Sequence, residues 1–301
     1  MENRRQLDGV AVGLLLVLCL SWGLQQVAIK AIVTEVSPVL QAAIRSIGAT
    51  LLVSLWMIAR KRPLFPRDGT LWWGVAAGLL FAFEFMLIYW GLDYTLASRA
   101  AIFLYTSPFV VALGSWLFIP SEKLRLDQVM GLACAFLGVV VIFGQSFDAL
   151  SGATLIGDAM LIGAAILWGA TTVLIKASPL RGIDPGRVLL YQLAVSALVL
   201  PLGSLALDEP GVTALTPFGI VSLLYQTVWI AAITYLVWFW LIRHYPAPRV
   251  ASFSFLTPVF GVAAGALLLG DQVSVKLLLA LGLVASGIYL VNRPAARKPV
   301  G

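Results

Sequence analysis

The sequence is poor in charge and in metal-binding side chains. Only 11% of its 301 residues are charged, against about 25% in a typical soluble domain. It has one histidine, His244, and two cysteines, Cys19 and Cys134, which lie in apolar runs and are expected to fill the core. It also lacks a Gly-Lys-Ser/Thr phosphate-binding sequence and a nucleophile elbow. We therefore expect no metal, no cofactor, no use of ATP and no enzyme active site.

Hydrophobic residues, by contrast, make up 60% of the chain, and the mean hydropathy is +0.97. Crossing about 30 Å of hydrocarbon takes roughly 20 apolar residues in a helix, and runs of this length follow one another with short polar breaks. The runs lack the alternation of membrane β-strands. The sequence therefore predicts an all-α membrane protein with ten transmembrane helices. Their expected ranges are 9–33, 37–59, 70–91, 97–119, 124–144, 153–177, 185–207, 217–243, 247–270 and 273–292.

The net charge of +6 comes from basic residues that cluster in the polar breaks. With ten helices, 16 Lys and Arg residues fall on the side of the two termini and three on the other side. The positive-inside rule then predicts a multi-pass protein of the bacterial inner membrane with both termini in the cytoplasm. Because membrane topology explains the basic residues, we expect membrane lipid and no nucleic acid as a partner. A monomer is compatible with the sequence.

The chain contains an internal repeat. The segment Ser21–Lys30, SWGLQQVAIK, returns 146 positions later as Leu167–Lys176, LWGATTVLIK. Two further pairs of segments match at nearly the same offset: Ala97–Val110 with Ala247–Phe260 at 150, and Glu122–Gly138 with Asp271–Gly287 at 149.

Each half holds five expected helices, an odd number, so the second half must enter the membrane from the opposite face. We therefore predict two inverted five-helix repeats, 1–146 and 147–301, around a central cavity. Inverted repeats open alternately to the two sides and bind substrate near mid-membrane, where the halves meet.

These features resemble the EamA type of the drug/metabolite transporter superfamily. The resemblance rests on the Trp-Gly start of each half, the Ser/Thr-Pro in each fourth helix and the acidic residue that opens each fifth helix. It covers nearly the whole chain, which is similar to the YddG-type amino-acid exporters within that family. The resemblance implies a basket-like fold whose cavity is built mainly from helices one to four and six to nine, with helices five and ten as peripheral supports.

Polar and aromatic side chains at mid-depth are the candidate substrate-binding residues. A buried indole N–H needs an acceptor, so Trp22 and Trp168 are expected to face the cavity; packing beside Gly23 or Gly169 is the alternative. An amide or hydroxyl in hydrocarbon also needs a partner, and the polar residues that follow the tryptophans either line the cavity or bond between helices. These residues are Gln25, Gln26, Thr171 and Thr172.

Arg45 and Glu84 are the only charges well inside the expected helices. They lie about 10 Å below the same membrane surface, so a structural ion pair is the leading interpretation. A role in binding a substrate carboxylate or ammonium, or in proton coupling, is the alternative. The second half carries Gln192 and Thr234 at the equivalent positions.

The expected eighth helix is rich in polar and aromatic residues, some of which must line the cavity. Thr227, Thr234 and Trp238 are spaced to share one helical face. Ser254 in the ninth helix is a further candidate, unless it bonds back to the preceding turn. The candidates from helices four and eight are Tyr105, Tyr225, Gln226, Trp229 and Thr234.

Pro108 and Pro258 fall midway along the expected fourth and ninth helices. Proline kinks a helix because it lacks an N–H and its ring clashes with the preceding turn. Matching kinks in both halves predict hinges for gating, with fixed bends as the alternative.

The sequence thus predicts a secondary transporter that exports small metabolites by alternating access, amino acids with aromatic or apolar side chains foremost. Aromatic groups suit an apolar side chain, and amides and hydroxyls suit a zwitterionic end. An exporter of drugs, nucleosides or other metabolites is the alternative within the same class. A membrane enzyme or scaffold without transport activity is the alternative from another class.

Overall fold

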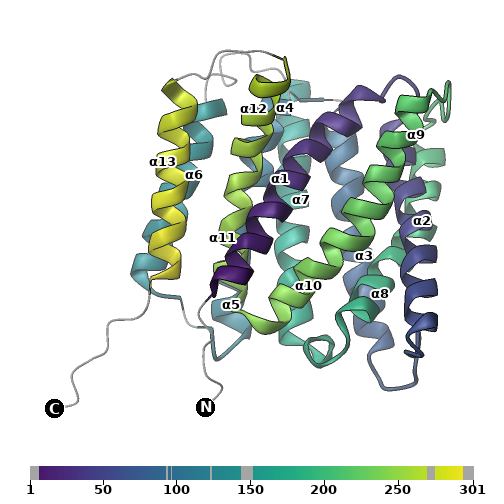
Figure 1. Ribbon diagram of the computed structural model, residues 1–301, viewed down its shortest axis with the longest axis horizontal. Coiled ribbons are helices and arrows are strands. Elements are labelled where there is room, and N and C mark those ends of the chain that lie inside the picture. The colour runs from purple at the N-terminus through teal and green to yellow at the C-terminus, as the bar shows by residue number, and fades with distance from the viewer. Residues whose placement is uncertain are drawn as a thin grey trace.

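The computed structural model describes residues 7–92, 94–95, 97–122, 124–143, 152–269 and 275–293. In these residues the helices run up and down a single bundle (Figure 1), and the predicted all-α fold of ten spans is confirmed. Seven spans of the described chain are single helices: α1 (Gly9–Ala31), α2 (Pro38–Ala59), α3 (Leu71–Leu92), α6 (Leu126–Phe143), α7 (Gly152–Ala177), α8 (Pro185–Ala206) and α13 (Val275–Asn292).

The other three spans are interrupted. The fourth consists of α4 (Ala97–Leu104) and α5 (Ser107–Phe118). The eighth consists of α9 (Pro217–Leu224), the π-helix η3 (Tyr225–Thr234) and α10 (Tyr235–His244). The ninth consists of α11 (Ala247–Ser252), the 3-10 turn η4 (Phe253–Phe255) and α12 (Leu256–Leu269), and a short 3-10 helix, η2 (Pro179–Gly182), links α7 to α8.

We call the end of the bundle where α1 begins the lower end and the opposite end the upper end, as drawn in Figure 1. The first half starts with α1 at the lower end. The second half starts with α7 at the upper end, where Gly157 packs against Gly91 near the end of α3. Corresponding spans therefore run in opposite directions. The predicted boundary between residues 146 and 147 lies outside the described residues and stays a prediction.

At the upper end the start of α2 is held by the other half of the chain. Pro38 opens α2 as predicted, but Ser37 does not cap it, because its hydroxyl donates to the carbonyl of Gly211 (2.9 Å). Instead, the carboxylate of Glu209 accepts two backbone N–H groups of the first turn, at 2.9 and 3.0 Å. A carboxylate complements the positive end of a helix, so the link between α8 and α9 fixes where α2 begins.

At the lower end the loop between α2 and α3 is tied to the start of α8. Arg62 pairs with Asp184, and Arg187 lies 2.7 Å from Asp68. The hydroxyl of Thr70 donates to the same Asp68 carboxylate (2.6 Å). This hydrogen bond, with the Arg187 cation, holds the pKa of Asp68 below its usual value. The loop therefore joins the two halves at the lower end.

Pro108 and Pro258 lie where their spans are interrupted, as predicted. α4 ends at Leu104, whose carbonyl receives no helical hydrogen bond because Pro108 has no N–H to donate, and α5 restarts at Ser107. In the ninth span, Phe253–Phe255 form the 3-10 turn just before Pro258. The kinks thus follow from proline geometry, and their role as hinges stays a prediction.

The eighth span changes pitch, which overturns one prediction from helical spacing. Thr227 and Thr234 were expected to share a face, but both lie in η3, where hydrogen bonds close wider turns than in an α-helix. The methyl group of Thr227 packs against Gly48 of α2. The hydroxyl of Thr234 instead meets Trp22 of α1, because a spacing of 3.6 residues per turn does not apply here.

Helices α6 and α13 meet through small residues that the repeat relates to one another. A Cβ atom on Gly131 would lie 2.7 Å from the carbonyl oxygen of Gly287, and one on Gly138 would lie 2.8 Å from that of Ala280. At the repeat offset of 149, Gly131 corresponds to Ala280 and Gly138 corresponds to Gly287. The second contact is therefore the first contact with the two halves exchanged. A two-fold interface repeats each contact in this way, so the inverted repeat is visible in individual contacts.

The repeated Trp-Gly pairs also make equivalent contacts. A Cβ atom on Gly23 would lie 2.9 Å from the carbonyl oxygen of Thr257 and 2.8 Å from a backbone nitrogen of α12. One on Gly169 would lie 3.3 Å from the carbonyl oxygen of Ser107, the equivalent of Thr257 at offset 150. In both copies, glycine lets the first span of one half approach the proline-bearing span of the other.

We expect Gly23→Ala to lower the stability of the purified protein by about 1–3 kcal/mol, because its methyl group would overlap backbone atoms that cannot move aside. The thermal midpoint of unfolding in detergent measures the loss. Gly13→Ala is the matched control on the same helix, since nothing lies within 4 Å of its Cβ position. Equal midpoints for Gly23→Ala and the unchanged protein would contradict the close helix contact.

Candidate functional site

A cavity lies between the two halves, and its lining extends from Ile29 and Tyr89 near the upper ends of α1 and α3 to Thr172 and Phe239 in the lower parts of α7 and α10. About 880 Å³ of space in and around the cavity is free of protein atoms, a figure that includes the open solvent at its mouth. Its wall comes from α1, α3 and the end of α4 in the first half, and from α7, α8 and α10 in the second. Both halves therefore contribute to one shared space.

Seven of the residues predicted from the sequence line this cavity. They come from four different spans, which the fold brings together at mid-depth. That these side chains bind substrate stays a prediction. They are Trp22, Gln25, Glu84, Tyr105, Trp168, Thr171 and Thr172.

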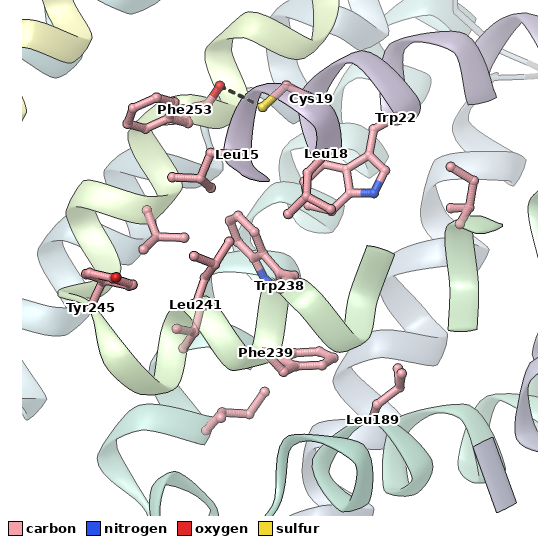
Figure 2. Packing of buried hydrophobic residues seen from close by; sticks show 14 of the residues in the cluster. Leu15, Leu18, Cys19, Trp22, Leu189, Trp238, Phe239, Leu241, Tyr245 and Phe253 are labelled. Carbon is pink, nitrogen blue, oxygen red and sulfur yellow. Dashed lines mark hydrogen bonds between the residues drawn. The ribbon is translucent and has the colours of Figure 1, made fainter. Parts of the chain in front are cut away.

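Trp22 is held in the wall by three residues of the eighth span. Its indole N–H donates to the hydroxyl of Thr234 (2.9 Å), which supplies the acceptor expected for a buried tryptophan. Its ring meets Trp238 edge-on at 5.2 Å between centroids, and Tyr235 at 6.0 Å. Figure 2 shows Trp22 and Trp238 facing each other from α1 and α10. The structure thus places Thr234 behind Trp22, outside the cavity lining.

Cys19 anchors the same part of α1. Its thiol donates to the carbonyl of Phe253 (3.1 Å) in the 3-10 turn of the ninth span (Figure 2). The side chain is buried and free of disulfide bonding, in keeping with a core position. The contact adds to the packing of α1 on the ninth span.

The polar residues of the cavity wall differ in how much hydrogen-bonding capacity they retain. Thr171 and Thr172 donate back to the preceding turn, at 2.8 and 3.3 Å, which leaves their oxygens able to accept. Gln25 is buried, and its amide makes no hydrogen bond within the described chain. The side chain of Gln26 lies outside the described residues. Gln25 is therefore the amide available to a ligand.

Four predicted residues of the eighth and ninth spans lie away from the cavity. The hydroxyl of Tyr225 and the indole of Trp229 donate to the carbonyl and hydroxyl of Ser21, each at 2.9 Å. The Gln226 amide donates to an amide oxygen of α2 (3.2 Å), and Ser254 donates to the carbonyl three residues earlier (2.7 Å). Tyr225, Gln226 and Trp229 lie in the π-helix and bond to α1 and α2, whereas Ser254 bonds within its own span.

The predicted ion pair between Arg45 and Glu84 is not formed. Among the described residues, no basic group lies within 4.0 Å of the Glu84 carboxylate, which lines the cavity. The guanidinium of Arg45 instead lies over the ring of Phe85, 4.1 Å from its centroid. Glu84 and Phe85 are neighbours in the chain and point about 100° apart around α3. Glu84 and Arg45 lie at the same depth, but the rotation of α3 places Phe85, and not Glu84, against Arg45.

Sequence reasoning missed much of the lining on α3, α8 and α10. The missed residues of α3 recur at intervals of three and four, the spacing of one helical face, and this signal could have revealed them. Gln192 of α8 was noted only as the equivalent of Arg45. The missed residues with rings or polar groups are Phe81, Phe85, Tyr89, Gln192, Tyr235, Trp238 and Phe239, and the missed aliphatic residues are Ile29, Ile88 and Leu104.

Comparison with known proteins identifies the fold and its class of function. The profile of the EamA-like transporter family matches residues 9–144 and 155–293. The chain belongs to the EamA-like transporter family. It is accordingly a transmembrane transporter and not an enzyme, and the family is built as two inverted five-helix repeats.

Several relatives of this EamA-like chain match over nearly their full length. A probable amino-acid metabolite efflux pump of Salmonella typhimurium is 30% identical, and the match covers 92% of this chain and 93% of that protein. A similarly named pump of Escherichia coli is 29% identical, with 94% of each chain covered. The uncharacterized transporter YoaV of Bacillus subtilis is 26% identical, with 93% and 96% covered. One solved crystal structure shares the fold at a TM-score of 0.78 and 17% identity, with 92% and 94% covered.

In this EamA-like transporter, four residues form a network below the cavity, which we call the lower-end network. Lys176 lies 2.5 Å from Glu122 and also donates to the carbonyl of Tyr245. The hydroxyl of Tyr245 donates to Asp8 (2.8 Å). The network joins the lower ends of α1, α5, α7 and α10, whereas the cavity lining extends upward to Ile29 near the top of α1. The network thus ties the two halves together at their lower ends.

Replacing the two partners of the Lys176–Glu122 ion pair tests whether this pair stabilises the lower-end network. Glu122→Gln and Lys176→Met should each lower stability by about 3–5 kcal/mol, because each breaks an ion pair in which the Glu122 side chain is only 7% exposed. The double variant should lose less than the sum of the two. Thermal midpoints in detergent provide the comparison.

The exposed pair between Arg62 and Asp184 is the control, with side chains 42% and 29% exposed. Arg62→Met should cost less than about 1 kcal/mol, and Asp184 is left in place because its carboxylate also caps α8. Additive losses at Glu122 and Lys176 would contradict direct pairing.

Proposed function

We propose that this transporter exports small metabolites, and in particular amino acids with aromatic or apolar side chains. The observation that supports this proposal is the composition of the cavity wall. Aromatic rings such as Trp22, Trp168 and Phe81 surround the Glu84 carboxylate and the Gln25 amide, neither of which has a hydrogen-bonding partner in the described chain. Rings suit an apolar side chain, and the free polar groups suit a zwitterionic end.

The relatives support the same class of substrate. Two of them, each about as long as this chain, are named as probable efflux pumps for amino-acid metabolites. These names describe those two proteins. In this chain, the aromatic rings and free polar groups of the cavity suit a substrate of the same class.

We infer that transport proceeds by alternating access. The two halves make equivalent contacts in opposite directions, and inverted repeats of this kind allow two related conformations around a fixed central site. Opening toward the lower end requires the Lys176–Glu122 pair to separate. The interruptions next to Pro108 and Pro258 are the places where the fourth and ninth spans can bend.

Counterflow in liposomes tests the proposal. Purified protein loaded with unlabelled phenylalanine, leucine or tryptophan should accumulate the labelled amino acid, and nucleosides should not compete. Trp22→Ala and Trp168→Ala should each lower the initial rate by at least ~10-fold, because both rings form the cavity wall. Trp72→Ala is the control, since that ring is 78% exposed at the lower end of α3.

Two outcomes of this experiment would contradict the proposal. Competition by nucleosides in place of amino acids would assign a different substrate class. Full rates in both cavity variants, with protein incorporated normally, would remove the tryptophans from the substrate site.

We also propose that the protein resides in the bacterial inner membrane with both termini, and thus the lower end, in the cytoplasm. The basic residues concentrate on that side, as the positive-inside rule requires. A C-terminal green fluorescent protein fusion should therefore fluoresce, and a C-terminal alkaline phosphatase fusion should be inactive. The opposite pair of results would reverse the orientation and place the lower-end network at the outer surface.

A further inference from the structure

The guanidinium of Arg45 is the most poorly satisfied polar group near the cavity. Arg45 is fully buried in α2, and all three guanidinium nitrogens lack a hydrogen-bond partner in the described chain. A guanidinium offers five N–H donors, and buried charges in natural proteins are paired. Because Arg45 makes no ion pair with Glu84, a structural pair does not account for its presence.

Two aromatic rings separate this charge from the cavity. The Arg45 guanidinium carbon lies 4.1 Å from the centroid of Phe85 and 6.0 Å from that of Tyr235. Both rings line the cavity. Ring faces attract the cation, but no acceptor of the described chain lies within hydrogen-bond distance of its N–H groups. The rings thus stabilise the positive charge of Arg45, while its N–H groups remain without acceptors. Aromatic rings that line the cavity lie between the guanidinium and the cavity.

A second unsatisfied polar group lies close to Phe85 on α3. The hydroxyl of Tyr89, one helical turn above Phe85, is buried without a partner in the described chain, and Tyr89 lines the cavity. Glu84 precedes Phe85 in α3 and presents its carboxylate to the same space. The wall formed by α2 and α3 therefore holds one positive and one negative charge that form no ion pair, together with a hydroxyl donor.

We propose that this wall is the recognition site for the charged end of an α-amino acid. The substrate carboxylate enters between the rings of Phe85 and Tyr235 and accepts hydrogen bonds from Arg45. The substrate ammonium group lies against Glu84. The inference rests on the proposed transport of amino acids and deepens it, because it names the residue that selects a carboxylate.

This assignment explains why the site tolerates an unmatched cation. A buried charge with no acceptor is costly in the empty protein, but it discriminates strongly against ligands that cannot supply one. Amines share the side chain of the substrate and leave Arg45 without an acceptor, and amino-acid esters offer only a neutral carbonyl in place of the carboxylate. The planar fork of arginine also binds a carboxylate through two parallel hydrogen bonds, which lysine cannot reproduce.

The test compares four probes that share the phenyl side chain and differ at the charged end: phenylalanine, phenylalanine methyl ester, phenethylamine and 3-phenylpropionate. In proteoliposomes, the unchanged protein should prefer phenylalanine over phenethylamine by at least ~10-fold. Arg45→Met should bring this preference close to one while the rate for phenethylamine is retained. Arg45→Lys keeps the charge without the fork and should give an intermediate preference. Glu84→Gln should instead relax the discrimination against 3-phenylpropionate, which lacks the ammonium group.

Stability measurements separate recognition from a structural role. Arg45→Met removes an unmatched buried charge and should leave the thermal midpoint in detergent unchanged or raised. Arg187→Met is the matched control, since Arg187 is also buried but pairs with Asp68 outside the cavity. It should lower the midpoint and leave the preference among the probes unchanged.

The outcomes are distinguishable. If the unchanged protein carries none of the probes and no other amino acid, the proposed function fails, and the assignment of Arg45 fails with it. If it carries phenylalanine and Arg45→Met keeps the full preference over phenethylamine, the function stands and the assignment is overturned. A lowered midpoint in Arg45→Met with an unchanged preference would identify Arg45 as purely structural. If Arg45→Met does not insert, full preference in Arg45→Lys overturns the assignment.

Discussion

The close approach of backbones between the two halves is the constraint on which the rest of this structure depends. Gly23 and Gly169 allow the first span of each half to reach the proline-bearing span of the other, and α6 meets α13 at Gly131 and Gly287. In lipid, association between helices relies on such close packing, because burial of apolar surface offers no advantage over the acyl chains. These contacts hold two antiparallel halves together and leave a space between their middle sections.

Several polar groups in the cavity wall have no hydrogen-bonding partner, whereas the polar groups behind the wall are bonded to one another. Trp22 is fixed by Thr234, and the polar residues of η3 bond to α1 and α2. By contrast, Gln25, Glu84 and the guanidinium behind Phe85 retain unused donors and acceptors. Buried polar groups are normally satisfied within a protein, so a cluster that is not satisfied is suited to a ligand that completes it.

Much of this architecture could be predicted from the sequence, because length, composition and repetition report directly on membrane spans. Helix ranges and the breaks at Pro108 and Pro258 followed from known backbone chemistry. Side-chain direction was harder to predict. Arg45 and Glu84 were placed at one depth, but depth does not specify the rotation of a helix. In η3 the π-helical pitch, which has no sequence signature here, turned Tyr225, Gln226 and Trp229 away from the cavity.

The central claim is that one cavity shared by the two inverted halves is reached from both sides of the membrane in turn. The most direct test places a single cysteine at Gln25, in the cavity wall, after replacement of Cys19 and Cys134. Membrane-impermeant thiol reagents should label this cysteine when applied to either face of oriented vesicles, and a transported amino acid should protect it from both. Labelling from one face only, in a variant that still transports, would contradict alternating access to the cavity.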